Sequence, residues 1–146
     1  MNRKLILLLT LICISVCCYS QMQNSQSSLM GKKWIKKERY ETNILEFSRD
    51  SIIDTSKYSL INKTVRYSKP YYLSDNIPTS FDFTKVGKPS QGKYLIDYND
   101  RVHELEYCEI KALDDNKLIL FYEQKDGYIG GADMTVTYTR MKLEYE

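Results

Sequence analysis

The chain has 146 residues, of which 42% are hydrophobic, and its 21 lysines and arginines stand against 19 aspartates and glutamates. That length suits a single domain, and the nearly balanced charge argues against general nucleic-acid binding, which needs excess positive charge to displace counterions from phosphates. Cys108 is the only cysteine after residue 20, so the body of the chain has no intramolecular disulfide and no CxxC metal or redox site.

Residues 1–20 have the three-part organisation of an export signal. Residues 1–4 form a short basic head, residues 5–16 are an unbroken run of apolar or small residues, and residues 17–20 are small or polar. The apolar run is well short of the ~20 residues with which a helix spans a bilayer. We therefore predict a signal peptide over 1–20 and an exported protein.

The way the signal ends has two readings. Cleavage after Ser20 leaves 126 residues and removes Arg3 and Lys4, so that 19 basic residues balance 19 acidic ones. In the other reading Cys17 or Cys18 carries a lipid, as in bacterial lipoproteins. The expected location is periplasmic, secreted or lipid-anchored in the outer membrane, with the anchor as the only membrane contact.

The segment 21–30 is polar, rich in serine and glutamine, and without hydrophobic periodicity. Such a composition predicts a flexible tether between the export signal and a folded domain over 31–146.

The folded domain has the pattern of short β-strands. Tyrosine, threonine, isoleucine and valine are spread through it, and apolar residues recur at every second position rather than at helical spacing. We predict an all-β fold, a single antiparallel meander of about eight to ten strands closed into a barrel, because closure removes exposed edges. A two-sheet sandwich is the competing architecture. Alternating segments include Leu45/Phe47, Tyr94/Ile96/Tyr98, Leu118/Leu120/Tyr122 and Met134/Val136/Tyr138.

One strand shows a change of phase. Leu105 and Tyr107 occupy odd positions, whereas Cys108, Ile110 and Ala112 continue on even ones. A strand keeps one buried face through such a shift only by accommodating an extra residue, so the pattern predicts a β-bulge near residues 107–109.

Five segments carry a family resemblance: residues 31–34, 45–50, 94–96, 110–120 and 138–141. Together they resemble the lipocalin-like (calycin-type) small β-barrel proteins exported by Bacteroidota. The resemblance implies that Trp34 plugs the closed end of the barrel and that Arg140 stacks over its ring. Without the resemblance, Trp34 is simply a core residue and Arg140 a solvated strand residue.

Candidates for catalysis and metal binding are few. His103 is the only histidine and follows a turn, which favours an exposed residue. Glu104 and Glu106 lie two apart and so share one strand face, which fits the solvated face of a barrel strand better than an acid–base pair. We predict no catalytic residue, no metal, no cofactor and no enzymatic activity.

The aromatic residues are the better candidates for ligand binding or interaction. Residues 69–92 contain all three prolines of the chain in a predicted long irregular connection, which is a candidate lid or interaction surface. A glycine-rich hairpin loop follows at 127–131. The candidate residues are Tyr71, Tyr72, Phe81, Phe83, Tyr94 and Tyr128.

Two functions remain open at this point. In the first, the barrel is a non-enzymatic binding protein that holds a small apolar or amphipathic molecule. In the second, it is a protein-interaction module: an inhibitor, an immunity-type protein or an accessory subunit of a cell-envelope complex, with loop tyrosines as anchors. An interior filled by bulky aromatic residues would count against the first function.

Overall fold

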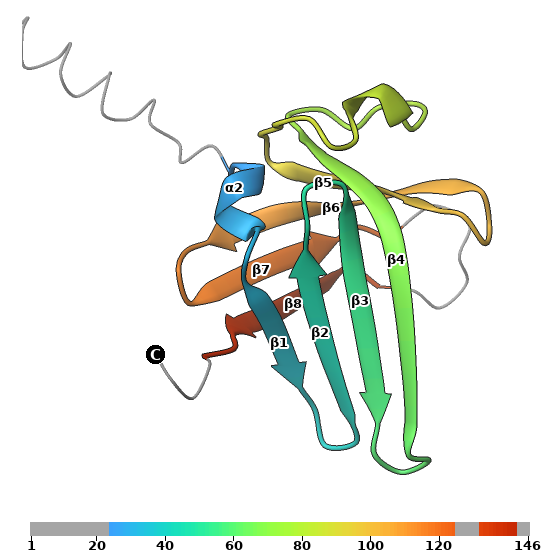
Figure 1. Ribbon diagram of the computed structural model, residues 1–146, viewed down its shortest axis with the longest axis vertical. Helices are drawn as coiled ribbons and strands as arrows, with labels where there is room; N and C mark the ends of the chain where they lie inside the picture. Colours follow the sequence, from blue (N-terminus) through green and yellow to red (C-terminus); the bar gives the residue numbers. More distant parts are fainter. Residues whose placement is uncertain (1–23, 125–131, 143–146) are drawn as a thin grey trace, which may run out of the picture.

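A computed structural model describes residues 24–124 and 132–142, which form a closed, all-antiparallel barrel of eight strands in sequence order (Figure 1). The predicted all-β meander barrel is confirmed, with the lower of the predicted strand numbers. The strands are β1 (Lys33–Lys37), β2 (Glu41–Phe47), β3 (Ser51–Tyr58), β4 (Lys63–Ser74), β5 (Tyr94–Asn99), β6 (Glu104–Leu113), β7 (Lys117–Tyr122) and β8 (Met134–Arg140), with helix α2 (Gln26–Leu29) and a 3-10 turn η1 (Phe83–Lys85).

The period-two pattern of the sequence becomes an inward and an outward face. Because successive side chains alternate, each strand sends every second residue into the barrel, where these residues form one core. In β7, for example, Leu118 and Leu120 are buried in the core, whereas Ile119 between them is only half-buried. The largest fully buried side chains of the core are Trp34, Tyr71, Leu29, Leu118, Leu120 and Cys108.

Helix α2 closes one end of the barrel. Leu29 and Trp34 are both completely buried, and the Trp34 indole Nε1 donates to the Leu29 carbonyl oxygen over 3.5 Å. The Gln26 side-chain amide donates to the Arg49 carbonyl oxygen at 2.6 Å, which ties the helix to the β2–β3 turn. No helix in the described part of the chain is long and apolar enough to cross a membrane.

The predicted tether over 21–30 is therefore wrong for residues 24–30, which pack onto the barrel. Polarity misled the prediction, because the glutamine and serine side chains here make hydrogen bonds within the fold while Leu29 is the buried anchor. Residues 21–23 and the predicted signal peptide over 1–20, including Cys17 and Cys18, lie outside the described residues.

The β-bulge is present, but farther along β6 than predicted. The register with β7 shifts between Ile110 and Ala112, so the inward face moves from Cys108 and Ile110 on even positions to Leu113 on an odd one. The prediction near residues 107–109 assumed that Tyr107 belonged to the core, whereas it pairs with outward-facing Ile96 of β5. The interior side chain at that level of β6 is Glu106.

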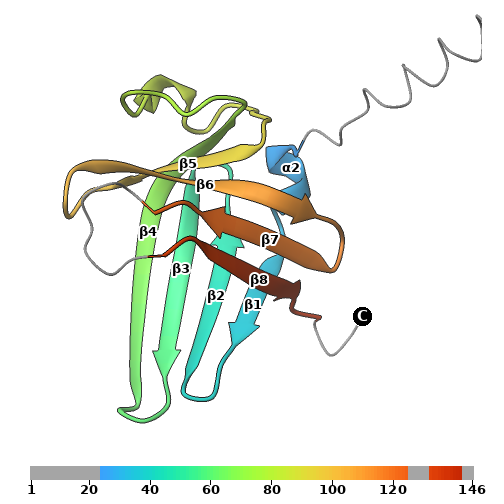
Figure 2. The same ribbon diagram turned by 180° about the vertical axis from the view of Figure 1, so that it is seen from behind.

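The long connection between β4 and β5 is shorter than predicted and lies outside the barrel. Residues 69–74 belong to β4, which leaves a loop over 75–93. The loop contacts the segment around α2 through two backbone hydrogen bonds of 3.0 Å. The backbone N–H of Gln26 donates to the Ser90 carbonyl, and that of Gly92 donates to the Asn24 carbonyl. Both ribbon views show it at the α2 end of the molecule (Figures 1 and 2).

Gly92 is the residue that lets this loop approach β4. Its φ is +145°, and an added Cβ would overlap the backbone carbonyl group of Ser74. We expect Gly92→Ala to lower the free energy of unfolding by about 3 kcal/mol, because backbone atoms rather than a flexible side chain must move. Urea denaturation measures the change.

Gly31→Ala is the matched control, since φ is +70° there but no atom lies within 4 Å of the added Cβ. It should cost only the left-handed backbone penalty of about 1 kcal/mol. Equal losses for the two variants would contradict the close approach of Gly92 to β4.

Candidate functional site

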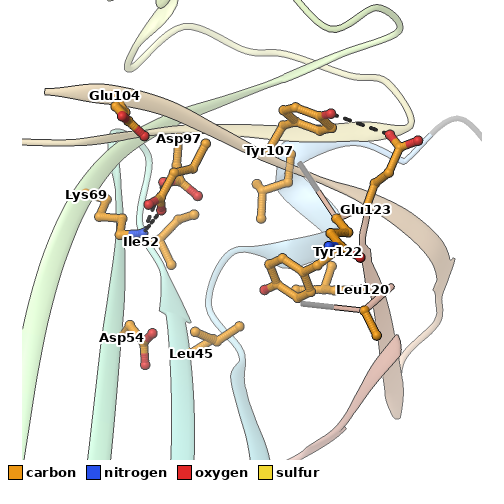
Figure 3. A pocket seen from close by; sticks show the side chains of 14 residues that line it. Leu45, Ile52, Asp54, Lys69, Asp97, Glu104, Tyr107, Leu120, Tyr122 and Glu123 are labelled. Carbon is orange, nitrogen blue, oxygen red and sulfur yellow. Dashed lines mark hydrogen bonds and ion pairs between the residues drawn. The ribbon is translucent and has the colours of Figure 1, made fainter. Parts of the chain in front are cut away.

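The barrel interior is not completely filled. A cavity of about 500 Å³ extends from the core to the end of the barrel opposite α2, where β5 turns into β6. Its walls combine four aliphatic side chains, two tyrosines and several charged groups (Figure 3). The aliphatic and aromatic residues are Leu45, Ile52, Leu95, Leu120, Tyr107 and Tyr122, and the acidic ones are Asp54, Asp97, Glu104, Glu106 and Glu123, with Lys69, Gln124 and Ala132 completing the lining.

Strand register orders these groups by depth. On β5, Leu95 lies one inward step deeper than Asp97, and on β3, Ile52 lies one inward step deeper than Asp54. On β6, Glu106 is paired with Asp97, and Glu104 is one inward step nearer the mouth. The cavity therefore has an aliphatic inner part and an acidic outer part.

Lys69 is the only basic residue of the described lining, and it is already engaged. Its Nζ lies 3.2 Å from Asp97 Oδ1 and also donates to Glu106 Oε2. The other Glu106 oxygen accepts from the Asn99 amide at 2.9 Å. These side chains come from β4, β5 and β6 and form a half-buried network on one wall of the cavity.

Burial and mutual repulsion shape the protonation of this network. Burial raises the pKa of Asp97 to about 6, with the neighbouring Glu106 charge adding to the effect and Lys69 opposing it. Burial also opposes ionisation of Glu106, but hydrogen bonds from Lys69 and Asn99 outweigh it, and its pKa is lowered. For Lys69, burial favours the neutral amine, yet Asp97 and Glu106 raise its pKa.

Asp54 is the acid of this wall with an unused buried oxygen. Its Oδ1 is inaccessible to solvent and has no hydrogen-bond partner among the described residues. Burial raises the pKa of Asp54, and the charge of Lys69 partly opposes this. A carboxylate in this condition is costly unless a partner arrives, since a buried charge needs compensation.

The opposite wall includes Tyr122 and Leu120, with Glu123 beside them (Figure 3). Burial raises the pKa of Tyr122, so its phenol stays protonated at physiological pH. Burial also raises the pKa of the nearby Cys108 thiol to about 12, which keeps it from acting as a thiolate nucleophile. Tyr107 at the rim donates to Glu123 Oε2 over 3.4 Å.

None of the five described aromatic candidates from the sequence lines this cavity. Tyr71 points into the closed end, where its ring packs edge-on against Phe47 at 5.6 Å and its hydroxyl donates to the Ser48 carbonyl at 2.8 Å. Tyr94 faces outward and packs against Tyr107 at 6.4 Å. Tyr128 lies outside the described residues.

The other three candidates meet on the outside of the barrel. Phe81 packs against Tyr72 at 5.2 Å and against Phe83 at 4.8 Å, and both phenylalanines also contact Tyr98. Tyr72 is fully buried beneath loop 75–93, whereas Phe83 is 59% exposed. This aromatic cluster fastens the loop to β4 and β5, and no residue of loop 75–93 lines the cavity.

Trp34 and Arg140 are strand partners across the β1–β8 pairing. Trp34 lies at the end closed by α2, and Lys32 Nζ lies 5.6 Å from the centroid of its ring. Stacking of Arg140 over the ring stays a prediction.

The acidic pair Glu104 and Glu106 was assigned to the solvated face of a barrel strand. Glu104 is exposed, but the face that the two residues share borders the cavity, and Glu106 is half-buried there. His103 is exposed in the β5–β6 turn with a φ of +57°. Sequence reasoning missed Asp54, Lys69 and Asp97 altogether. A usable signal existed: each acid follows an aliphatic residue by two positions, as in Ile52–Asp54 and Leu95–Asp97, and so shares its inward face.

Among the described residues, no group of three or more histidine, cysteine, aspartate or glutamate side chains is arranged to hold a metal ion. Comparison of the chain with protein-family models, with curated proteins and with solved structures finds no match. The geometry of the cavity is therefore the basis for a functional proposal.

Asp97 should make the stability of the protein depend on pH. A folded-state pKa of about 6, against the usual 3.8, means that its contribution to stability is complete below about pH 4 and is lost as the pH rises through 6. We expect Asp97→Asn to raise the free energy of unfolding at pH 7.5 by up to about 3 kcal/mol. The substitution should also reduce the fall in that free energy between pH 4 and 7. Urea denaturation across this pH range measures it.

Asp100→Asn, at an exposed turn position three residues later, is the control and should leave the profile unchanged. A loss of stability in Asp97→Asn at pH 7.5 would mean that the ion pair with Lys69 outweighs the burial of the carboxylate.

Proposed function

We propose that this protein is an exported, non-enzymatic binding protein that holds one small amphipathic molecule inside its β-barrel. The observation that carries the proposal is the unfilled interior: the cavity of about 500 Å³ lies within the range of about 300–1,000 Å³ typical of small-molecule sites. Eight-stranded barrels are just wide enough to hold one such ligand. The combination of aliphatic inner walls and a polar outer part suits a ligand with an apolar and a polar end.

A relation to the lipocalin-like barrels exported by Bacteroidota is part of the proposal. It is supported by the eight-stranded closed meander and by the position of Trp34 beside the helix that closes one end. Export rests on the signal-like residues 1–20, with lipid attachment at Cys17 or Cys18 as one of the two forms. Nucleic acid and cofactors have no part in the proposed function.

The composition of the cavity supports binding over catalysis. Its described lining contains no serine, threonine, cysteine or histidine, and His103 is exposed outside it. Three of the five acidic groups that line it are held by Lys69 or, at the rim, by Tyr107. Charge recognition accounts for them without a reaction.

A second candidate function is supported by the outer aromatic cluster. Phe83 is 59% exposed on loop 75–93 and is held by Phe81 and Tyr98, which makes it a preformed aromatic anchor of the kind found at protein interfaces. A cell-envelope protein is the expected partner in that case.

Native mass spectrometry of the mature protein purified from its own host separates the two functions. A co-purifying small molecule supports the binding protein, whereas a stoichiometric protein partner supports the interaction module. The same measurement on a membrane fraction tests whether Cys17 or Cys18 carries lipid.

Filling the cavity should abolish binding of a neutral hydrophobic probe. We expect N-phenyl-1-naphthylamine to bind the mature protein one to one with increased fluorescence, and Leu120→Trp to remove this signal because residue 120 faces the cavity. Ile119→Trp, one position away on the outward face, should retain it.

Because overpacking costs about 1–3 kcal/mol, the smaller change Leu120→Phe is tested alongside, with folding checked by circular dichroism. Unchanged probe binding in both folded Leu120 variants would refute binding inside the barrel.

A further inference from the structure

We propose that the ligand is a cationic amphiphile, an amine or quaternary ammonium compound whose apolar part lies against Ile52, Leu95 and Leu120 and whose positive head lies among Asp54, Asp97 and Glu106. This inference rests on the proposed function and specifies the chemistry of its ligand. Three independent features of the cavity support it: its charge balance, the state of Lys69 and the depth at which the carboxylates lie.

The charge balance of the cavity is negative. Five acidic side chains line the described part of it against one lysine. Lys69 compensates at most one of the two acids that it contacts, and Asp54 keeps a buried oxygen without a hydrogen-bond partner. In a partly dehydrated cavity such an imbalance acts on a ligand more strongly than it would in water.

Lys69 is not available to bind an anion. An anionic lipid or fatty acid would need a cation in the cavity, and the ammonium group of Lys69 is occupied by Asp97 at 3.2 Å and by Glu106. A carboxylate ligand would have to displace one of these acids into a cavity that is already acidic. A ligand cation meets the opposite situation, because its charge would offset the excess of carboxylates that line the cavity.

The depth of the charged groups argues for an amphiphile rather than a small bare cation. Asp54 and Asp97 each lie one inward step nearer the mouth than Ile52 and Leu95, so a ligand whose head reaches them must place its remaining volume against aliphatic walls. Burial of that apolar part provides most of the binding free energy. The ring of Tyr122 on the opposite wall adds a surface that favours a cation.

Three ligands with the same ten-carbon chain isolate the effect of charge: decylammonium, decanol and decanoate, each below its micelle concentration. Isothermal titration calorimetry of the mature protein at pH 7.5 should give decylammonium an affinity at least about tenfold higher than decanol, with decanoate weakest. Leu120→Trp should abolish the binding of all three, which excludes adsorption to the outer surface.

Asp54→Asn tests the role of the buried carboxylate. We expect it to lower decylammonium affinity about tenfold while leaving decanol affinity unchanged, because the substitution keeps the shape and removes the charge. The matched control is Glu46→Gln on the neighbouring strand β2. Glu46 alternates with inward-facing Leu45 and Phe47 and is ion-paired with Lys33 at 3.1 Å, so both affinities should stay as in the wild type.

The outcomes distinguish this inference from the function beneath it. Equal affinity for decylammonium and decanol, or a preference for decanoate, overturns the cationic ligand and leaves a barrel that binds amphiphiles. A parallel loss of both affinities in folded Asp54→Asn also overturns it, since the residue would then act through structure alone. Absence of binding by all three compounds overturns the proposed function as well.

Discussion

The antiparallel pairing of β1 with β8 closes the sheet and thereby defines an interior. Trp34 is placed opposite Arg140 and Ile35 opposite Thr139, and the seam is extended by the Met141 amide, which donates to the Lys33 carbonyl at 2.8 Å. Once the sheet is closed, each strand side chain points either into the barrel or to its outer surface, because side chains alternate along a strand. Every inward position must then be filled by a core side chain or border on the cavity.

Inward positions of the barrel are mostly apolar, and the charged residues found on some of them are its distinguishing feature. The closed end is packed in the ordinary way, with Trp34, Tyr71 and Leu29 fully buried. Toward the mouth, carboxylates occupy positions that aliphatic residues would fill if stability alone mattered, since burying a charge is costly unless it is paired. The raised pKa of Asp97 and the unused oxygen of Asp54 are the physical signs of this cost. Neutralising these groups is the role that we propose for the ligand.

The architecture was predictable from sequence because alternation and turn spacing are local signals. Leu118/Leu120/Tyr122 and Met134/Val136/Tyr138 were each placed correctly on one face. The site was not predictable in the same way, because an acid at an inward position looks like an acid on a solvated face until the partner strands are known. Glu106 illustrates the problem: its neighbours Leu105 and Tyr107 are the more apolar residues, yet they face outward.

The described aromatic candidates do not line the cavity, for a related reason. Tyr71 and Tyr72 are adjacent in sequence and therefore point to opposite sides of β4, one into the closed end and one beneath loop 75–93. Only tertiary packing decides which tyrosines border the cavity, and they are Tyr122 and, at the rim, Tyr107. No local sequence pattern marks Lys69 as a site residue, because its role depends on Asp97 of β5 and Glu106 of β6.

The most direct test of the account is a pH titration of the side-chain carboxyl carbons by ¹³C NMR in the ligand-free mature protein. If Asp97 faces the interior beside Glu106, its carboxyl should titrate near pH 6, and the signal of Glu106 should respond in the same range because the two groups are in contact with Lys69. Titration of Asp97 near 3.8 with no response from Glu106 would place these residues in solvent and contradict an acidic cavity inside the barrel.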